Sequence, residues 1–477
     1  MPTPSSIKNK VLRGGVFLTL RQLLSSGLSL ISVFVIARTL GPEKYGLVAS
    51  SFGLFYFISW TGQMGLNTYL MRQPDLQENE PEQLLAFYST VGLLFCGAVW
   101  AIAPIFSQWT GVSEVSTIIR WLVPAMWLNM VGGVPAGMLT RELAFARVSL
   151  VESLSQIANY LLSVPIVLIY KSYWGPIAGM LLQFLMAASL AYAFYPIRLT
   201  LRWRWSHLSR MMAYGITFFV ASGVQSLRVL TIPLFVTPLA GVEAAGIVGI
   251  TIRMLEQLSL LRNVIRGMSI SVMAKLMNDA SAIQRAIKRG MSYLALLMMS
   301  VCALFACLSP WLIPFAFGSE WVQSTQIFPP VAFAASAIAV FDLHLATLHA
   351  LGKNNEVTFQ NVVYIGLLWL CCSLLIPPLG LWGYAIAEVA ALPSLYFSHR
   401  FFSQLYGSPN YWNAALLLAT AIPALIASVL LSPIESFVIL SFSYGVLVMA
   451  SSEIRDVLID VFQIAKSMKA KDRLDVV

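Results

Sequence analysis

Gly41-Pro-Glu-Lys-Tyr-Gly-Leu-Val48 recurs 200 residues later as Gly241-Val-Glu-Ala-Ala-Gly-Ile-Val248, with Gly, Glu, Gly and Val in the same places. A second echo pairs Trp174-Gly-Pro-Ile-Ala178 with Trp382-Gly-Tyr-Ala-Ile-Ala387, at a shift of 208 residues. Similarity at a nearly constant spacing marks an internal repeat. Because the two echoes occur in the same order, we interpret the chain as a duplication.

Long apolar runs surround these echoes. The chain is 58% hydrophobic and 11% charged, with a mean hydropathy of +0.77, whereas soluble domains have about 25% charged residues. A membrane-spanning helix needs about 20 mostly apolar residues. The runs therefore predict an all-α polytopic membrane protein of about fourteen spans: 12–37, 46–71, 85–108, 116–139, 148–170, 174–196, 211–238, 244–272, 289–312, 325–350, 357–377, 380–402, 411–431 and 434–451.

The repeat and the spans together predict the organisation of the chain. Six spans are an even number, so the two copies share one orientation, and parallel repeats of this kind place the substrate at their interface. We expect a central cavity between two six-helix lobes. The predicted parts are an N-lobe (1–198), an interfacial linker (199–210), a C-lobe (211–403), two extra spans (404–452) and an amphipathic tail (453–477).

The basic charge of the chain, +9, is explained by topology. With the N-terminus placed in the cytoplasm, the inner segments hold 21 Lys and Arg residues and the outer segments hold 4. This asymmetry is the positive-inside pattern, and it predicts that both termini are cytoplasmic. A nucleic-acid partner is not expected.

The extramembrane segments are too short for a catalytic domain. The connection 73–82 is acidic and is expected to be solvated. The Trp and Arg residues of 199–210 suit an anchor at the membrane interface, and a hinge between the two lobes is the alternative. The five cysteines and four histidines lack the spacing of a disulfide framework or a metal site. We predict no enzyme activity, no metal and no cofactor.

Val35-Ile-Ala-Arg-Thr-Leu-Gly-Pro-Glu-Lys-Tyr-Gly46 resembles the signature that follows the first helix of bacterial polysaccharide-transport flippases. These proteins belong to the multidrug/oligosaccharidyl-lipid/polysaccharide exporter superfamily. Arg141-Glu-Leu-Ala-Phe145 and Leu381-Trp-Gly383 are also similar to that family. The resemblance implies a two-lobed transporter of the bacterial inner membrane that moves undecaprenyl-diphosphate-linked oligosaccharides to the outer leaflet. It implies contacts with membrane lipids, and with a polysaccharide polymerase and export machinery.

Charged residues inside the spans are the candidate site, because each costs about 2.5–3.5 kcal/mol on insertion scales. Guanidinium groups bind phosphate through two parallel hydrogen bonds and keep their proton. The superfamily lines its cavity with spans one, two, seven and eight. We therefore assign five arginines to the anionic head group of the cargo: Arg21, Arg228, Arg253, Arg262 and Arg266.

Each of these residues also has a structural interpretation. Arg253 and Glu256 are three residues apart and can neutralise each other. Arg262 and Arg266 lie near a helix end, from which their charges can reach the membrane surface. Candidate ion-coupling residues, which polar packing between helices would explain equally well, are Glu152, Asp342, His344 and Glu388. Gly41, Gly46, Gly241 and Gly246 are the predicted hinge positions between the lobes.

Three alternative functions remain open. A multidrug exporter of the same superfamily would call for acidic groups in the first lobe. A peptidoglycan-precursor flippase would have the same architecture. A glycan polymerase would bring a larger extramembrane loop, which makes it the weakest alternative.

Overall fold

The computed structural model describes residues 4–73, 75–77, 79–200, 203–260, 262, 265, 269, 273–276 and 279–460, without the side chains of 4–26, 217, 218, 220–222 and 225. Every regular element of these residues is helical. By its internal contacts the chain divides into two units, Met1–Gly249 and Ile250–Val477, and the division falls inside one helix.

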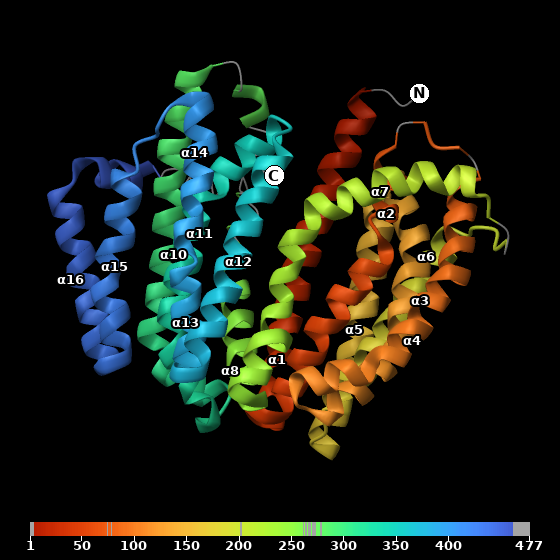
Figure 1. Cartoon of the computed structure of the whole chain (residues 1–477). Coiled ribbons are helices and arrows are strands. Elements are labelled where there is room, and N and C mark those ends of the chain that lie inside the picture. The colour runs from red at the N-terminus through yellow and green to blue at the C-terminus, as the bar shows by residue number, and fades with distance from the viewer. Residues whose placement is uncertain are drawn as a thin grey trace, which may run out of the picture. The chain divides into compact units, whose positions relative to one another are not determined.

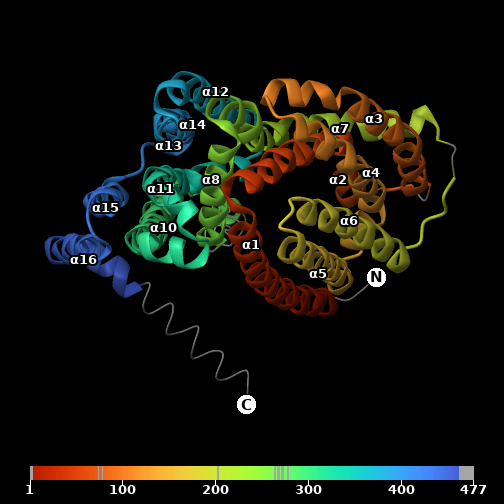
Figure 2. The same cartoon turned by 90° about the horizontal axis from the view of Figure 1, so that it is seen from below.

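The first unit begins with a 60-residue helix, α1 (Pro4–Gln63), which is broken at Gly41. Around it stand α2 (Leu66–Arg72), α3 (Glu80–Thr110), α4 (Ser113–Arg141), α5 (Phe145–Tyr170) and α6 (Trp174–Phe194) (Figure 1). α5 packs along both α6 and α1, and α4 packs along α3 and α6 (Figure 2). The unit ends with α7 (Trp205–Ser226), a 3₁₀ turn η1 (Leu227–Leu230), a π turn η2 (Ile232–Val236) and the first part of α8 (Thr237–Leu258).

The second unit contains the rest of α8 and α10 (Ala280–Ala316), η3 (Ser319–Trp321), α11 (Val322–Ala350) and α12 (Asn354–Leu379). These are followed by α13 (Leu381–Ala390), η4 (Leu392–Ser394), α14 (Leu395–Tyr406), α15 (Trp412–Leu430) and α16 (Pro433–Ala450). α10 packs against α11 and α15, and α15 packs against α16 (Figure 1). The predicted lobe boundary at 199–210 stays a prediction.

The protein is a multi-pass membrane protein. Ten helices of the described part are long and apolar enough to span a membrane. Large apolar side chains lie on their outer surface, with Leu94, Phe442 and Met449 exposed to 73%, 71% and 84%, as expected of helices that face lipid. The ten are α3, α4, α5, α6, η1–α8, α10, η3–α11, α12, α15 and α16.

The predicted count of fourteen spans differs from these ten where helices are broken or incompletely described. The first two predicted spans fall together in α1, which Gly41 interrupts. The predicted span 380–402 is divided by η4, where Pro393 interrupts the run between α13 and α14. The predicted span 244–272 enters a stretch of which the structure describes only isolated residues.

The sequence repeat is also a repeat of backbone geometry. Gly41 has φ 72° and ψ 171° inside α1, and Gly241 has φ 91° and ψ 171° inside α8. A positive φ is strained for residues with a Cβ atom, so both positions favour glycine. The two matched octapeptides therefore begin at equivalent breaks in two helices.

The second glycines of the two octapeptides, Gly46 and Gly246, lie at a crossing of α1 and α8. A Cβ atom on Gly46 would lie 1.9 Å from the carbonyl oxygen of Val242, and one on Gly246 would lie 2.0 Å from that of Pro42. The contacts are reciprocal, since Pro42 and Val242 follow Gly41 and Gly241. The repeat thus brings its own two copies into backbone contact.

The glycines of the second echo, Gly175 and Gly383, also lie where two helices approach closely. A Cβ atom on Gly175 would lie 2.7 Å from the carbonyl oxygen of Ser163 and 2.6 Å from the Val167 side chain, and one on Gly383 would lie 2.3 Å from the carbonyl oxygen of Leu375. Each glycine begins a helix that folds back tightly on the preceding one. Val167 and Leu375 stand eight residues before their glycines, so the two hairpins repeat each other in register.

The composition of the connection 73–82 predicted that it is solvated, but one of its acidic residues is buried. Glu80 is fully buried, accepts a hydrogen bond from the Tyr69 hydroxyl (3.1 Å) and accepts another from the backbone N–H of Gln77 (3.1 Å). Arg210 of α7 approaches the same carboxylate at 3.9 Å. An acidic residue in a polar run was expected to face water, and the tertiary fold encloses it instead.

The linker before α7 lies against α3. Trp203 donates from Nε1 to Thr90 Oγ1 (3.1 Å) and meets Phe87 edge-on, while the Arg204 backbone N–H donates to Gln83 Oε1 (2.7 Å). Trp205 is 62% exposed, and its role as an interfacial anchor stays a prediction. One tryptophan of the predicted anchor is therefore a packing residue.

The segment after α16 is held to the second unit by polar contacts. Glu453 accepts hydrogen bonds from Lys288 Nζ (2.9 Å) and Asn413 Nδ2 (2.7 Å), and these lower the pKa of the Glu453 carboxyl. Ile454 is buried in the core formed around α10 and α15. The predicted amphipathic tail is helical over 452–460, and 461–477 lie outside the described residues.

Candidate functional site

The predicted cationic residues are distributed over both units. Arg228 lies in η1 of the first unit, whereas Arg253 and Arg262 belong to the second unit. The side chain of Arg21 and the whole of Arg266 lie outside the described residues, so their assignment to the cargo stays a prediction.

Arg228 sits at the start of an irregular stretch inside a membrane-spanning segment. Pro233 supplies no backbone N–H to the π turn η2, and irregular turns of this kind recur at functional positions. The Trp109 indole donates to the Leu234 carbonyl (3.0 Å), and the Thr237 hydroxyl donates to the Ile232 carbonyl (3.0 Å). These side chains supply the partners that backbone groups need in hydrocarbon.

The same stretch touches α1 through its backbone. A Cβ atom on Gly53 would lie 2.7 Å from the Val229 carbonyl oxygen and 3.2 Å from the Pro233 ring. The Ser50 and Thr237 hydroxyls share a hydrogen bond (2.7 Å) just beyond this contact. The half-buried Arg228 is thus carried by a segment that is fixed on one side against α1.

Arg253 pairs with Glu256 along α8, as their spacing predicted. Arg253 Nη1 lies 3.1 Å from Glu256 Oε2, and the two side chains are 42% and 56% exposed. The pair is the local neutralisation that the spacing of three residues predicts. The contact of Arg253 with the cargo stays a prediction.

Arg262 and Asp342 form an ion pair that the sequence analysis had separated. Arg262 Nε donates to Asp342 Oδ2 (2.6 Å) and Nη2 donates to Oδ1 (3.0 Å). Asp342 is 2% exposed and Arg262 is 19% exposed. The predicted cargo residue and the predicted ion-coupling residue are therefore one unit, joined across 80 positions of sequence that no local spacing rule connects.

His344 points to a different partner from Asp342, because residues two apart on one helix lie on different faces. Its Nε2 lies 2.8 Å from the Tyr411 hydroxyl, which also lies 2.9 Å from Nδ1 of His399. The His344 and Tyr411 rings are stacked, with planes 8° apart. Tyr411 and His399, to which no pattern in the sequence points, make His344 part of the packing between α11, α14 and the start of α15.

The two glutamates of the predicted set have contrasting surroundings. Glu388 is 1% exposed and accepts hydrogen bonds from the hydroxyls of Tyr364 (2.8 Å) and Tyr384 (2.7 Å), one on each oxygen. Glu152 is exposed, at a cavity of about 190 Å³ between α4 and α5 that Thr140 also lines. Of these two glutamates, Glu152 is the more exposed, and a role of either in ion coupling stays a prediction.

Arg141, of the motif that follows α4, holds the end of α2. Its Nη1 donates to the carbonyl oxygens of Leu70 (3.0 Å) and Gln73 (2.5 Å). Carbonyls at a helix C-terminus lack helical partners, and a guanidinium stabilises them through hydrogen bonds and charge. This motif residue positions the connection 73–82 and is not part of the cationic set within the spans.

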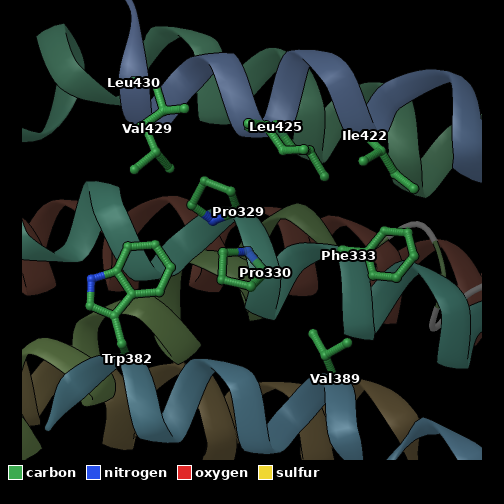
Figure 3. Close-up of a pocket in the computed structure, with 10 residues that line it drawn as sticks. Pro329, Pro330, Phe333, Trp382, Val389, Ile422, Leu425, Val429 and Leu430 are labelled. Carbon is green, nitrogen blue, oxygen red and sulfur yellow. The ribbon is translucent and has the colours of Figure 1, made fainter. Parts of the chain in front are cut away.

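A second cavity, of about 360 Å³, lies in the second unit between α11, α13 and α15. Figure 3 shows that Pro329 and Pro330 face α15 while Trp382 and Val389 close the opposite side. The lining is hydrocarbon apart from the indole N–H of Trp382. No charged side chain lines it, so this cavity does not suit a diphosphate.

A family model described as "Polysaccharide biosynthesis protein" matches residues 35–326, more than half of the 477-residue chain. The chain belongs to this family. The matched residues include both octapeptides, Arg228, Arg253 and Arg262. The family comprises membrane transporters of polysaccharide biosynthesis and not enzymes.

Two curated relatives are similar to part of this chain. Succinoglycan biosynthesis transport protein ExoT of Rhizobium meliloti (strain 1021) is 22% identical over 191 residues, which are 40% of this chain and 39% of ExoT. Lipopolysaccharide biosynthesis protein WzxC of Escherichia coli (strain K12) is 19% identical over 155 residues, 32% of each chain. The chain matches less than half of the length of each relative.

The fold is that of solved transporters. The lipid II flippase MurJ in an inward closed conformation superposes with a TM-score of 0.68 over 93% of this chain and 100% of MurJ, at 13% identity. An inward-facing multidrug resistance MATE transporter superposes with a TM-score of 0.64 over 82% of this chain and 98% of the transporter, at 15% identity. At these identities the similarity concerns the fold alone.

Proposed function

We propose that the protein is a flippase for lipid-linked oligosaccharide units in the export of a cell-surface polysaccharide. The observation that supports this most is the family membership, combined with guanidinium groups placed in helices of a membrane transporter. ExoT and WzxC are named for transport and biosynthesis of polysaccharides. A lipid-linked diphosphate needs positive charge along its route, whereas a cationic drug does not.

The proposal includes the finer architecture. Fourteen spans would form two parallel six-helix lobes, 1–198 and 211–403, around a central cavity, with 404–452 as an added pair and both termini in the cytoplasm. Transport would proceed by rocking one lobe against the other. The breaks at Gly41 and Gly241, with the crossing at Gly46 and Gly246, would be the pivot. The substrate, membrane lipids and the polymerase and export machinery would be the partners.

Transport by purified protein in proteoliposomes tests the function. Fluorescent lipid-linked oligosaccharide, lipid II and a cationic dye are supplied in parallel to the same preparation. We expect movement of the lipid-linked oligosaccharide alone. Movement of lipid II alone would assign the chain to peptidoglycan precursors, and uptake of the dye alone would make it a drug exporter.

Neutralising Arg253 is expected to abolish complementation of a flippase-null strain. Arg253→Ala removes charge-assisted hydrogen bonds to phosphate, each about 1.5–3 kcal/mol, and so weakens binding about 10- to 100-fold. Surface polysaccharide and membrane protein level are measured together. Arg120→Ala is the matched control, because Arg120 stacks 4.6 Å over Trp100 and is not among the proposed cargo residues. Full complementation by Arg253→Ala would overturn the assignment.

A further inference from the structure

The guanidinium group of Arg262 binds the carboxylate of Asp342 in the geometry in which a guanidinium group also binds phosphate. Two parallel hydrogen bonds, of 2.6 and 3.0 Å, join the guanidinium edge to both carboxylate oxygens. A phosphate group offers the same edge the same pair of oxygens. Asp342 therefore occupies on Arg262 the position that a phosphate of the cargo would take.

Asp342 cannot lose this partner without a further change. It is 2% exposed on α11, a helix most of whose residues are buried. A buried carboxylate that loses its cation is strongly destabilised unless it becomes neutral. Arg262, at 19% exposure, is the member of the pair that an incoming anion can reach.

Two other titratable side chains of the described residues lie near the pair, one on α11 and one on α10. On α11 itself, His344 is bonded to Tyr411, which also binds His399 of α14. From α10, the buried thiol of Cys302 lies near Arg262. Among the residues that the structure describes, Arg262 supplies the positive charge that neutralises Asp342.

We propose that cargo diphosphate and the Asp342 carboxylate compete for Arg262, so that binding of one cargo molecule is coupled to uptake of one proton by Asp342. The ion pair breaks, two hydrogen bonds form from Arg262 to a phosphate group, and Asp342 is neutralised by one proton taken up from the solution. Release of the cargo reverses each step. This inference rests on the proposed function and extends it to the residues that link cargo and protons.

Binding of undecaprenyl diphosphate to the full-length protein in lipid nanodiscs, between pH 6 and 8, tests the proposal. Wild-type affinity should increase as the pH falls, by up to about tenfold per unit more than in Asp342→Asn, because one extra proton is bound. The difference between the two slopes removes the titration of the probe itself. Asp342→Asn should bind more tightly than wild type at pH 8, and Arg262→Ala should bind at least tenfold more weakly.

Glu356→Gln is the matched control. It removes the carboxylate of the Lys353–Glu356 pair (3.3 Å), which is more exposed, at 47% and 28%, and should leave the pH slope of wild type intact. Thermal unfolding of every variant separates stability from binding. Equal slopes in wild type and Asp342→Asn, or unchanged affinity in a folded Arg262→Ala, would overturn the exchange while leaving the flippase in place. Failure of wild type to bind the probe at any pH would instead contradict the proposed function.

Discussion

Gly246→Val is expected to reduce transport to background while the protein still inserts into the membrane. The new Cβ atom would lie 2.0 Å from the Pro42 carbonyl oxygen and 3.1 Å from the Gly46 backbone nitrogen. Both are backbone atoms of a helix, so no rotation of a side chain relieves the contact. The two helices must therefore move apart where they cross. If this crossing is the pivot of transport, as proposed, the variant cannot complete the movement of the lobes.

The reciprocal variant and a matched control sharpen this test. Gly46→Val should have the same effect, because its Cβ atom would lie 1.9 Å from the Val242 carbonyl oxygen. Gly97→Val is the control, since Gly97 is in α3 with no atom within 4 Å of the added carbon. Surface polysaccharide, transport in proteoliposomes and the amount of inserted protein are measured together. Wild-type transport by Gly246→Val would show that the crossing does not have to close.

The features that could be predicted from the sequence are those in which backbone geometry restricts the residue type. Gly41 and Gly241 were matched from sequence alone, and the structure places both at helix breaks with the same ψ of 171°. Gly46 and Gly246 were matched in the same way. Where two backbones touch, only glycine fits, so a glycine occurs at the same position in both copies of the repeat.

The pairing of charged residues could not be predicted in this way. Arg253 and Glu256 are neighbours on one helix, so a spacing of three predicts their contact. Arg262 and Asp342 are separated by 80 residues, and many other pairings of the buried charges were equally compatible with the composition. The burial of Glu80 escaped prediction for the same reason, because it depends on which helices enclose the loop.

Gly383→Ala should be the most destabilising of three alanine substitutions that are chemically identical. Its added carbon would lie 2.3 Å from the Leu375 carbonyl oxygen and 2.6 Å from the Ile376 Cα atom, both in the backbone of α12. Overpacking costs about 1–3 kcal/mol and more where the neighbour cannot move. We expect loss of most folded protein in a thermal-unfolding assay of detergent extracts.

Two further alanine substitutions are compared with Gly383→Ala: one at the equivalent glycine of the first copy, and one at a glycine without close neighbours. Gly175→Ala, the equivalent change in the first copy, meets the movable Val167 side chain at 2.6 Å as well as the Ser163 carbonyl oxygen at 2.7 Å, so its loss should be smaller. Gly366→Ala, on α12 with nothing within 4 Å, should raise stability by up to about 1 kcal/mol, the helix preference of alanine over glycine. The expected order of unfolding temperature is Gly366→Ala, wild type, Gly175→Ala and Gly383→Ala. If Gly383→Ala unfolded at the temperature of Gly366→Ala, close packing at the two hairpins would not be the reason that the Trp-Gly pair recurs.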